Sequence, residues 1–347
     1  MKALVFAGPG KKELREVDKP RVVKDSDAVG RLVKTTICGT DLHILGGDVP
    51  AVKEGTILGH EGIGIVEEVG AGVSNFKVGD KVIISCVTSC GKCHYCKKSL
   101  YAHCEDGGWI LGHLINGTQA EYVHIPHADN SLYHIPQGIS DDAAVMISDI
   151  LPTGLEIGVL NGQVSPGDVV AIVGAGPIGM SALLTSQFYS PSKIIMIDLD
   201  DNRLQESKKF GATETINSRD AQAAIDKIFE MTDGRGVDVA IEAVGYPATF
   251  DICQRILSPG GRLANVGVHG KPVDLQLQDL WIRNVTISTG LVSTSTTPML
   301  IKTLETGKIK PERLATHRYK FDDMMEAYET FANAADEHAL KIIIDFQ

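Results

Sequence analysis

The chain lacks an apolar segment suited to crossing a membrane. Its long uncharged stretch, residues 169–192, contains three glycines and two prolines, which disfavour a continuous membrane helix. The first nine residues hold too short an apolar run for a secretory signal and end in Gly8 and Pro9. We therefore expect a cytoplasmic protein with no membrane partner.

The chain also has fewer positively charged than negatively charged side chains. Lysine and arginine number 33 against 44 aspartates and glutamates, which gives a formal net charge of -11. Such a surface repels the phosphates of nucleic acids, so we expect no nucleic-acid partner. Hydrophobic residues make up 43% and charged residues 22%, as in ordinary globular proteins, and 347 residues exceed the usual size of a single core.

The sequence changes character near residue 152. Before this point, short apolar runs such as 62–66 and 81–85 alternate with glycine-rich turns, which predicts a β-rich domain. Beyond it, apolar strands alternate with helical segments, which predicts a doubly wound parallel sheet. We expect an α/β protein with a catalytic domain of residues 1–152 and 288–347 and a dinucleotide-binding domain of residues 153–287. Near the C-terminus we expect a helix at 321–333 and a strand at 340–346.

Four of the seven cysteines lie within one short segment, at positions 90, 93, 96 and 104. Tetrahedral zinc takes four thiolates, and a short segment brings them together at little entropic cost. We expect Cys90, Cys93, Cys96 and Cys104 to bind a structural zinc ion. The alternative is a cluster of buried or redox-active thiols. Cys86 and Cys253 fit no such pattern, and we assign them no role.

A glycine turn follows the predicted strand at 168–173. Gly174, Gly176 and Gly179, with Pro177 and Ile178 between them, form the GxGxxG pattern that opens a helix. In this context the glycines let the backbone approach a pyrophosphate closely at the free N–H groups of the helix. An acidic residue, Asp198, follows 24 positions after the first glycine. We expect residues 174, 176–179 and 198 to bind a dinucleotide.

Two further segments carry metal-ligating residues, and each is weak evidence by itself. Residues 38–43 read Cys-Gly-Thr-Asp-Leu-His, and residues 59–62 read Gly-His-Glu-Gly. A single cysteine or histidine is more often packed or solvated than bound to a metal. From spacing alone, a dispersed zinc site therefore remains one of two interpretations.

Taken together, these motifs resemble the zinc-dependent medium-chain dehydrogenase/reductase family, whose best known members are alcohol dehydrogenases. The resemblance covers nearly the whole chain and follows the family's order, through residues 38–43, 59–62, 90–104, 174–179 and 197–198. It implies a GroES-like catalytic domain and a Rossmann nucleotide domain.

Residues 146–149 and 153–154 resemble the bacterial secondary-alcohol dehydrogenase branch of that family, in which an aspartate replaces a cysteine zinc ligand. This implies a catalytic zinc held by Cys38, His60 and Asp149, with Glu61 as a further carboxylate that can approach the metal. Three ligands leave the fourth position open for an alcohol, whose pKa zinc lowers. The prototype of the branch lacks the four cysteines that this chain retains.

The resemblance implies roles for several neighbouring residues. Thr40 and His43 are expected to carry the alcohol proton toward solvent, although a turn threonine and a solvated histidine are the alternatives. Asp41 is expected to orient a ligand histidine. Trp109 is expected to line the substrate pocket with Thr40 rather than to pack in a core.

The cofactor expected from the resemblance is NAD. The carboxylate of Asp198 can accept hydrogen bonds from the ribose hydroxyls of NAD, and it repels the 2'-phosphate of NADP. Asp200 and Asp201 add to the negative charge there. Arg203 is expected to contact the ribose, as in family members that use NAD.

The expected activity is reversible hydride transfer between a secondary alcohol and NAD, with two zinc ions per chain. A polyol or primary-alcohol dehydrogenase of the same family is the alternative within enzymes, and a non-catalytic zinc- and nucleotide-binding protein is the alternative outside them. We also expect a homo-oligomer, either a homotetramer or a dimer, since both occur among family members.

Overall fold

The computed structural model describes residues 1–346 and divides into two compact units. The first unit comprises Met1–Pro152 and Ser293–Gln347, and the second comprises Thr153–Val292. The sequence placed the second junction at residues 287 and 288. The structure places it after Val292, because strand β13 (Thr286–Thr289) pairs with β12 (Leu257–Asn265) and so belongs to the second unit.

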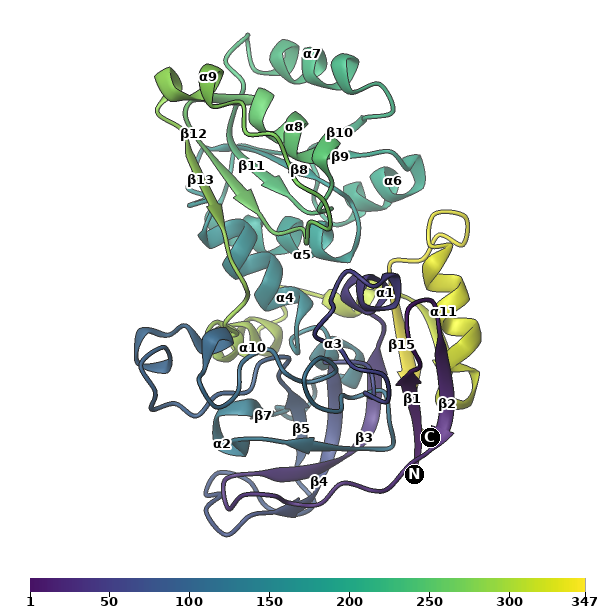
Figure 1. The fold of residues 1–347 in the computed structure, drawn as a ribbon. Coiled ribbons are helices and arrows are strands. Elements are labelled where there is room, and N and C mark those ends of the chain that lie inside the picture. The colour runs from purple at the N-terminus through teal and green to yellow at the C-terminus, as the bar shows by residue number, and fades with distance from the viewer. Residues whose placement is uncertain (347) are drawn as a thin grey trace. The chain divides into compact units, whose positions relative to one another are not determined.

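The first unit is built on a seven-stranded, mostly antiparallel sheet (Figure 1). Its strand order is β14-β15-β3-β4-β5-β7, and β6 pairs with β3. The bounds are β3 (Ala28–Thr36), β4 (Gly62–Val69), β5 (Lys81–Ile84), β6 (Tyr122–Ile125), β7 (Leu132–His134), β14 (Ala315–Lys320) and β15 (Lys341–Asp345). A separate antiparallel pair is formed by β1 (Lys2–Phe6) and β2 (Lys12–Glu16).

Short helices connect these strands. They are α1 (Gly39–Gly46), α2 (Ala128–Ser131), α3 (Asp141–Val145), α4 (Ile150–Thr153), α10 (Thr297–Glu305) and α11 (Met324–Ala332). The helix expected at 321–333 begins instead with a single 3-10 turn, η7 (Phe321–Asp323). The ring of Phe321 is buried and stacks on Phe346 at 4.5 Å, which fixes the chain before α11 begins. Buried Met324, Tyr328 and Phe331 then pack against the sheet at helical spacing.

The second unit contains a six-stranded parallel sheet of order β10-β9-β8-β11-β12-β13, with helices between the strands. The remaining strands are β8 (Val169–Val173), β9 (Lys193–Asp198), β10 (Glu214–Asn217) and β11 (Val237–Glu242). The helical segments are η3 (Gly154–Leu160), α5 (Pro177–Ser186), α6 (Asp201–Lys209), α7 (Ala221–Met231), α8 (Pro247–Arg255), α9 (Leu277–Leu280) and η5 (Trp281–Arg283). The prediction of a doubly wound sheet is confirmed.

Burial explains the apolar runs of the central strands. β8 and β11 lie in the middle of the sheet, and their side chains are almost completely buried because helices cover both faces (Figure 1). The uncharged stretch 169–192 becomes β8, a turn and α5. None of the helices formed by residues 1–346 combines the length and the apolar character that a bilayer span requires.

Candidate metal and nucleotide sites

Three metal-ligating side chains from separate parts of the chain meet in the first unit. Cys38 is the N-cap of α1, His60 lies two residues before β4, and Asp149 immediately precedes α4. Their ligand atoms all lie within 4.8 Å of one another, and all three side chains are buried. We call this set the three-group cluster.

The spacing of the cluster fits a tetrahedral zinc ion. Zinc bonds of about 2.0 Å to nitrogen or oxygen and 2.3 Å to sulfur place ligand atoms about 3.3 to 3.8 Å apart. His60 Nε2 lies 3.2 Å from Asp149 Oδ2, and Cys38 Sγ lies 3.8 Å from the same oxygen. Burial disfavours a charged imidazole, but hydrogen bonds to Asp149 and Cys38 outweigh burial and raise the pKa of His60 well above its usual value. The side chains of Asp149 and Cys38 would also compensate the positive charge of a bound cation.

Glu61, the further carboxylate, lies in a buried ion pair rather than in the three-group cluster. Its Oε2 accepts a hydrogen bond from Lys341 Nζ at 2.5 Å, and both side chains are 1% exposed. Burial raises the pKa of Glu61 to about 7, although the charge of Lys341 opposes this shift. Lys341 Nζ also donates to the carbonyl of Ile37, the residue before Cys38. Lys341 therefore links the two segments that carry Cys38 and His60, a role that its position in the sequence did not reveal.

Asp41 holds the cysteine segment through one of its two carboxylate oxygens. Its Oδ2 accepts hydrogen bonds from the backbone N–H of Cys38 at 2.9 Å and from Gln119 Nε2 at 3.1 Å. Gln119 is held in turn by the hydroxyl of Tyr328 at 2.8 Å. Asp41 Oδ1 is buried and has no hydrogen-bond partner among the described residues. Burial raises the pKa of Asp41 and the charge of His60 lowers it, so the two groups interact and the orientation of a ligand histidine by Asp41 stays a prediction.

The expected proton-transfer and pocket residues lie around the cluster. Thr40 Oγ1 is 3.8 Å from Cys38 Sγ. His43, three residues further along α1, is 32% exposed and its Nδ1 is 2.9 Å from Asp48 Oδ2. The ring of Trp109 meets that of His60 edge to face, with centroids 6.3 Å apart. Thr40 and Trp109 thus both border the three-group cluster.

The four-cysteine segment forms a second candidate metal site. The sulfurs of Cys90, Cys93, Cys96 and Cys104 all lie within 4.8 Å of one another, and the Cys90 and Cys96 sulfurs are 4.0 Å apart. That separation is close to the value of about 3.8 Å expected for two thiolates on one zinc ion. None of the seven cysteines, all of which lie within the described residues, forms a disulfide.

Local backbone geometry prepares these thiols for a cation. The backbone N–H of Cys90 donates to Cys104 Sγ at 3.2 Å, and that of Cys93 donates to Cys90 Sγ at 3.4 Å. Backbone N–H groups of Glu105 and Cys96 lower the pKa of Cys93 to about 6, whereas burial raises the pKa of Cys96 to about 12. A closed set of four sulfurs has no ligand position left for a substrate.

The predicted glycine turn connects β8 to α5. Gly174 has a φ of 108°, and a Cβ there would lie 2.6 Å from Val244. A Cβ on Gly179 would lie 1.7 Å from the carbonyl oxygen of Gly174, so only glycine fits. Gly176 is the N-cap of α5 and Pro177 follows at its first position, leaving Ile178 in the first turn. The turn therefore has the shape that a pyrophosphate site requires.

Asp198 ends β9 beside this turn. Its Oδ2 accepts a hydrogen bond from the N–H of Ala175 at 2.6 Å, and its Oδ1 accepts one from the N–H of Asp200 at 2.9 Å. A carboxylate has about four acceptor positions, so each oxygen can accept a further bond. Arg203 Nη1 lies 3.9 Å from the Cβ position of Gly176, so its guanidinium lies over the turn.

Glu242 is a buried carboxylate that sequence reasoning missed. It ends β11 and accepts hydrogen bonds from the N–H groups of Val244 and Gly245 and from the Thr249 hydroxyl at 2.6 Å. Its other oxygen faces His269 Nε2 at 3.5 Å. Glu242 therefore ties together the loops that follow β11 and β12, at the sheet edge where such folds bind ligands. The only local signal was an acidic residue closing an apolar strand.

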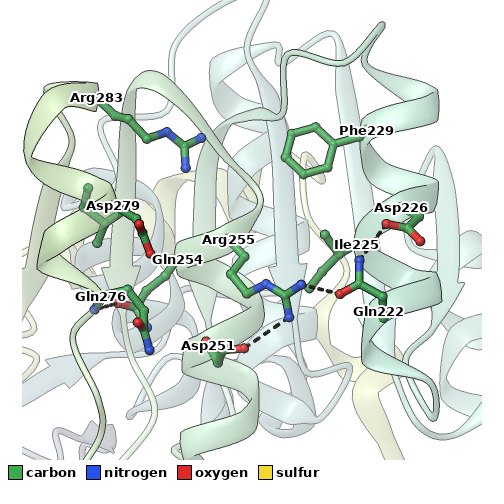
Figure 2. Close-up of a pocket in the computed structure, with 11 residues that line it drawn as sticks. Gln222, Ile225, Asp226, Phe229, Asp251, Gln254, Arg255, Gln276, Asp279 and Arg283 are labelled. Carbon is green, nitrogen blue, oxygen red and sulfur yellow. Dashed lines mark hydrogen bonds and ion pairs between the residues drawn. The ribbon is translucent and has the colours of Figure 1, made fainter.

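The second unit also contains a pocket of about 510 Å³ between α7, α8 and α9 (Figure 2). Arg255 lies at its centre, 3.5 Å from Asp251 and hydrogen-bonded to Gln222. Gln222 also donates to Asp226 at 2.7 Å. None of the predicted site residues lines this pocket, and several of its polar groups bind one another.

A parallel dinucleotide-type sheet and a buried Cys-His-Asp cluster in one chain define a metal-dependent oxidoreductase. Comparison with known proteins agrees. Residues 24–137 match the alcohol dehydrogenase GroES-like domain, and residues 177–306 match the zinc-binding dehydrogenase domain. An alcohol dehydrogenase of Cupriavidus necator is 37% identical over 99% of this chain and 98% of its own length.

Solved structures give the same result. Zinc dependent alcohol dehydrogenase 2 from Streptococcus pneumonia is 62% identical, covers 99% of this chain and 98% of its own, and superposes with a TM-score of 0.96. An Escherichia coli alcohol dehydrogenase complexed with NADH is 28% identical, with a TM-score of 0.89 over 100% of this chain and 99% of its own. The chain belongs to the zinc-dependent medium-chain dehydrogenase/reductase family. The predicted family, fold class and enzyme class, an alcohol dehydrogenase, are confirmed.

The four-cysteine site predicts a stabilising role. Cys93→Ser removes one of four sulfurs, so we expect loss of one bound zinc ion per chain and a melting temperature lowered by several degrees, because metal-binding energy contributes to folding. Elemental analysis and thermal unfolding measure both. Cys253→Ser, which changes a buried thiol in the second unit, is the control for loss of zinc. A zinc content and a melting temperature that are both unchanged in Cys93→Ser would contradict a structural zinc ion at the four cysteines.

Proposed function

We propose that the protein transfers a hydride reversibly between a secondary alcohol and NAD, with one zinc ion at the three-group cluster and a second at the four cysteines. The observation that carries this proposal is the cluster itself. It offers a thiolate, an imidazole and a carboxylate within 4.8 Å of one another, one ligand short of a tetrahedral set. A secondary-alcohol substrate is supported by the resemblance of residues 146–149 and 153–154 to the secondary-alcohol branch, in which an aspartate replaces a cysteine zinc ligand.

The residues around the cluster suit this chemistry. A zinc ion bound there supplies Lewis acidity, which lowers the pKa of a substrate hydroxyl. Thr40, 3.8 Å from the Cys38 sulfur, is placed to accept the hydroxyl proton. His43 lies one turn further along α1 and is partly exposed, so it can pass a proton to solvent. Trp109 supplies an apolar wall beside His60.

Two other functions would use the same residues differently. A polyol or primary-alcohol dehydrogenase would use the same metal site with a differently shaped pocket. A non-catalytic zinc- and nucleotide-binding protein would need neither an incomplete ligand set nor Thr40 beside it. The placement of Thr40 and Trp109 around the cluster favours an enzyme.

A substrate panel separates these possibilities. We expect kcat/KM to be highest for 2-butanol, lower for ethanol and lowest for sorbitol, measured by nicotinamide absorbance. Asp149→Asn removes a charged ligand and should abolish most of the activity while leaving the four-cysteine site and its zinc intact. A preference for sorbitol or ethanol would refute the secondary-alcohol assignment. No turnover of any alcohol or ketone would favour the non-catalytic alternative.

The preference for NAD follows from the charge of Asp198. A 2'-phosphate at about 4 Å from this carboxylate would cost about 4 kcal/mol at an effective dielectric constant of about 20. Screening at the partly exposed sheet edge leaves about 2 to 3 kcal/mol, which corresponds to a preference of about a hundredfold. Arg203, whose guanidinium lies over the glycine turn, is placed to contact the bound nucleotide.

Charge removal at Asp198 tests this explanation. Asp198→Gly should narrow or reverse the preference, but it also removes the hydrogen bonds to Ala175 and Asp200. Asp198→Asn removes the charge and keeps the size of the side chain, so it should narrow the ratio of kcat/KM for NADH and NADPH by at least tenfold. Asp233→Asn, which changes an exposed carboxylate elsewhere in the second unit, is the control. Faster ketone reduction by the unmodified enzyme with NADPH than with NADH would contradict the assignment.

The edge strand β13 supports assembly with a second copy of the chain. β13 pairs only with β12 among the described strands. The segment that leads into it exposes several large apolar side chains, and Trp281 and Ile282 are each 69% exposed. An unpaired edge beside exposed apolar groups is typical of an interface. A two-fold axis through this edge would make a dimer, and two dimers a tetramer. Cysteines placed to bind metal rather than to form disulfides also support a cytoplasmic location.

Sedimentation measures the assembly directly. We expect a mass of two or four chains, and we expect Trp281→Glu with Ile282→Lys to give monomers, because the charges cannot be buried. Val78→Lys, which changes an exposed apolar residue in the first unit, should leave the mass unchanged. A wild-type monomer at micromolar concentration would refute assembly.

A further inference from the structure

Cys86, which the sequence left without a role, contacts the carboxylate of the three-group cluster. It lies two residues after β5 and is 2% exposed. Its backbone N–H donates to the carbonyl of Ser148 at 3.0 Å, which brings the chain alongside Asp149. Its Sγ then lies 3.5 Å from Asp149 Oδ1, within the range of a thiol-to-carboxylate hydrogen bond.

The two oxygens of Asp149 therefore face different partners. Oδ2 points into the cluster, 3.2 Å from His60 Nε2 and 3.8 Å from Cys38 Sγ. Oδ1 points to the Cys86 thiol. The carboxylate is thus oriented so that one oxygen faces the cluster while the other is hydrogen-bonded outside it.

This orientation matters because aspartate differs from the cysteine that other members of the family use. A thiolate offers a metal one donor atom, whereas a carboxylate offers two. An aspartate that binds through both oxygens fills the position that an open site keeps for substrate. A hydrogen bond to one oxygen opposes that binding mode.

We propose that Cys86 is a positioning residue: its thiol holds Asp149 Oδ1, so that Asp149 gives the metal a single oxygen and leaves the substrate position open. This inference rests on the proposed catalytic zinc site. Cys86 acts through Asp149 and is not itself a ligand, in agreement with its place outside the three-group cluster.

Cobalt substitution provides a readout other than activity. Mild chelation followed by Co²⁺ loads the catalytic site and leaves zinc in the four-cysteine site. Four-coordinate Co²⁺ absorbs visible light several times more strongly than five-coordinate Co²⁺. We expect Cys86→Ala to weaken the visible bands severalfold and to raise the KM for alcohol about tenfold, with a smaller change in kcat. Cys86→Ser keeps a donor and should restore both values.

Two controls separate positioning from packing. Cys253→Ala removes a fully buried thiol from the second unit and should leave the spectrum unchanged. In an Asp149→Cys background the ligand has only one donor atom, so adding Cys86→Ala should no longer alter the spectrum. Cys86→Val fills the space of the thiol and replaces Cys86→Ala if the smaller side chain prevents folding.

Each outcome bears on a different claim. An unchanged cobalt spectrum in both Cys86→Ala and Cys86→Val would overturn the positioning role. A decrease in sulfur-to-cobalt charge transfer in Cys86→Ser would also overturn it, by showing that Cys86 supplies a second sulfur to the metal beside Cys38. Failure of the unmodified protein to bind Co²⁺ after chelation would instead refute the proposed catalytic site.

Discussion

The buried ion pair between Lys341 and Glu61 is the constraint on which the catalytic unit depends. A lysine ammonium out of water is tolerated only with close partners, and breaking a buried pair costs about 3 to 5 kcal/mol. Lys341 lies in β15 and binds Glu61 and the carbonyl of Ile37, which adjoin His60 and Cys38. The ladders from β15 to β3 and from β3 to β4 hold these segments in register. Strand pairing and charge neutralisation thus bring together the segments that carry Cys38 and His60.

The sequence predicted most reliably the features made by neighbouring residues. The glycine turn and the four-cysteine segment are local, so their spacing alone indicated their chemistry. The three-group cluster is dispersed, and spacing alone gave it no more weight than ordinary packing; family resemblance was needed to select Asp149. The roles of Lys341, Cys86 and Glu242 depend on contacts made only after folding. Lys341 meets Glu61 across 280 positions of sequence, and no local pattern reveals such a pair.

One error has an equally specific physical cause. The second domain junction was placed too early because β13 is short and partly polar, and only its ladder with β12 shows that it belongs to the sheet. Hydrogen bonding between strands, which local sequence does not reveal, decided the domain boundary.

The sequence separation of the two proposed metal sites implies an order of maturation. The four cysteines span 15 residues, from Cys90 to Cys104, so a nascent chain could capture an ion there once that short segment leaves the ribosome. The other proposed site needs Asp149, and its supporting cation, Lys341, is translated much later. If both sites bind zinc, the supply of metal during growth would act on them at different moments of synthesis.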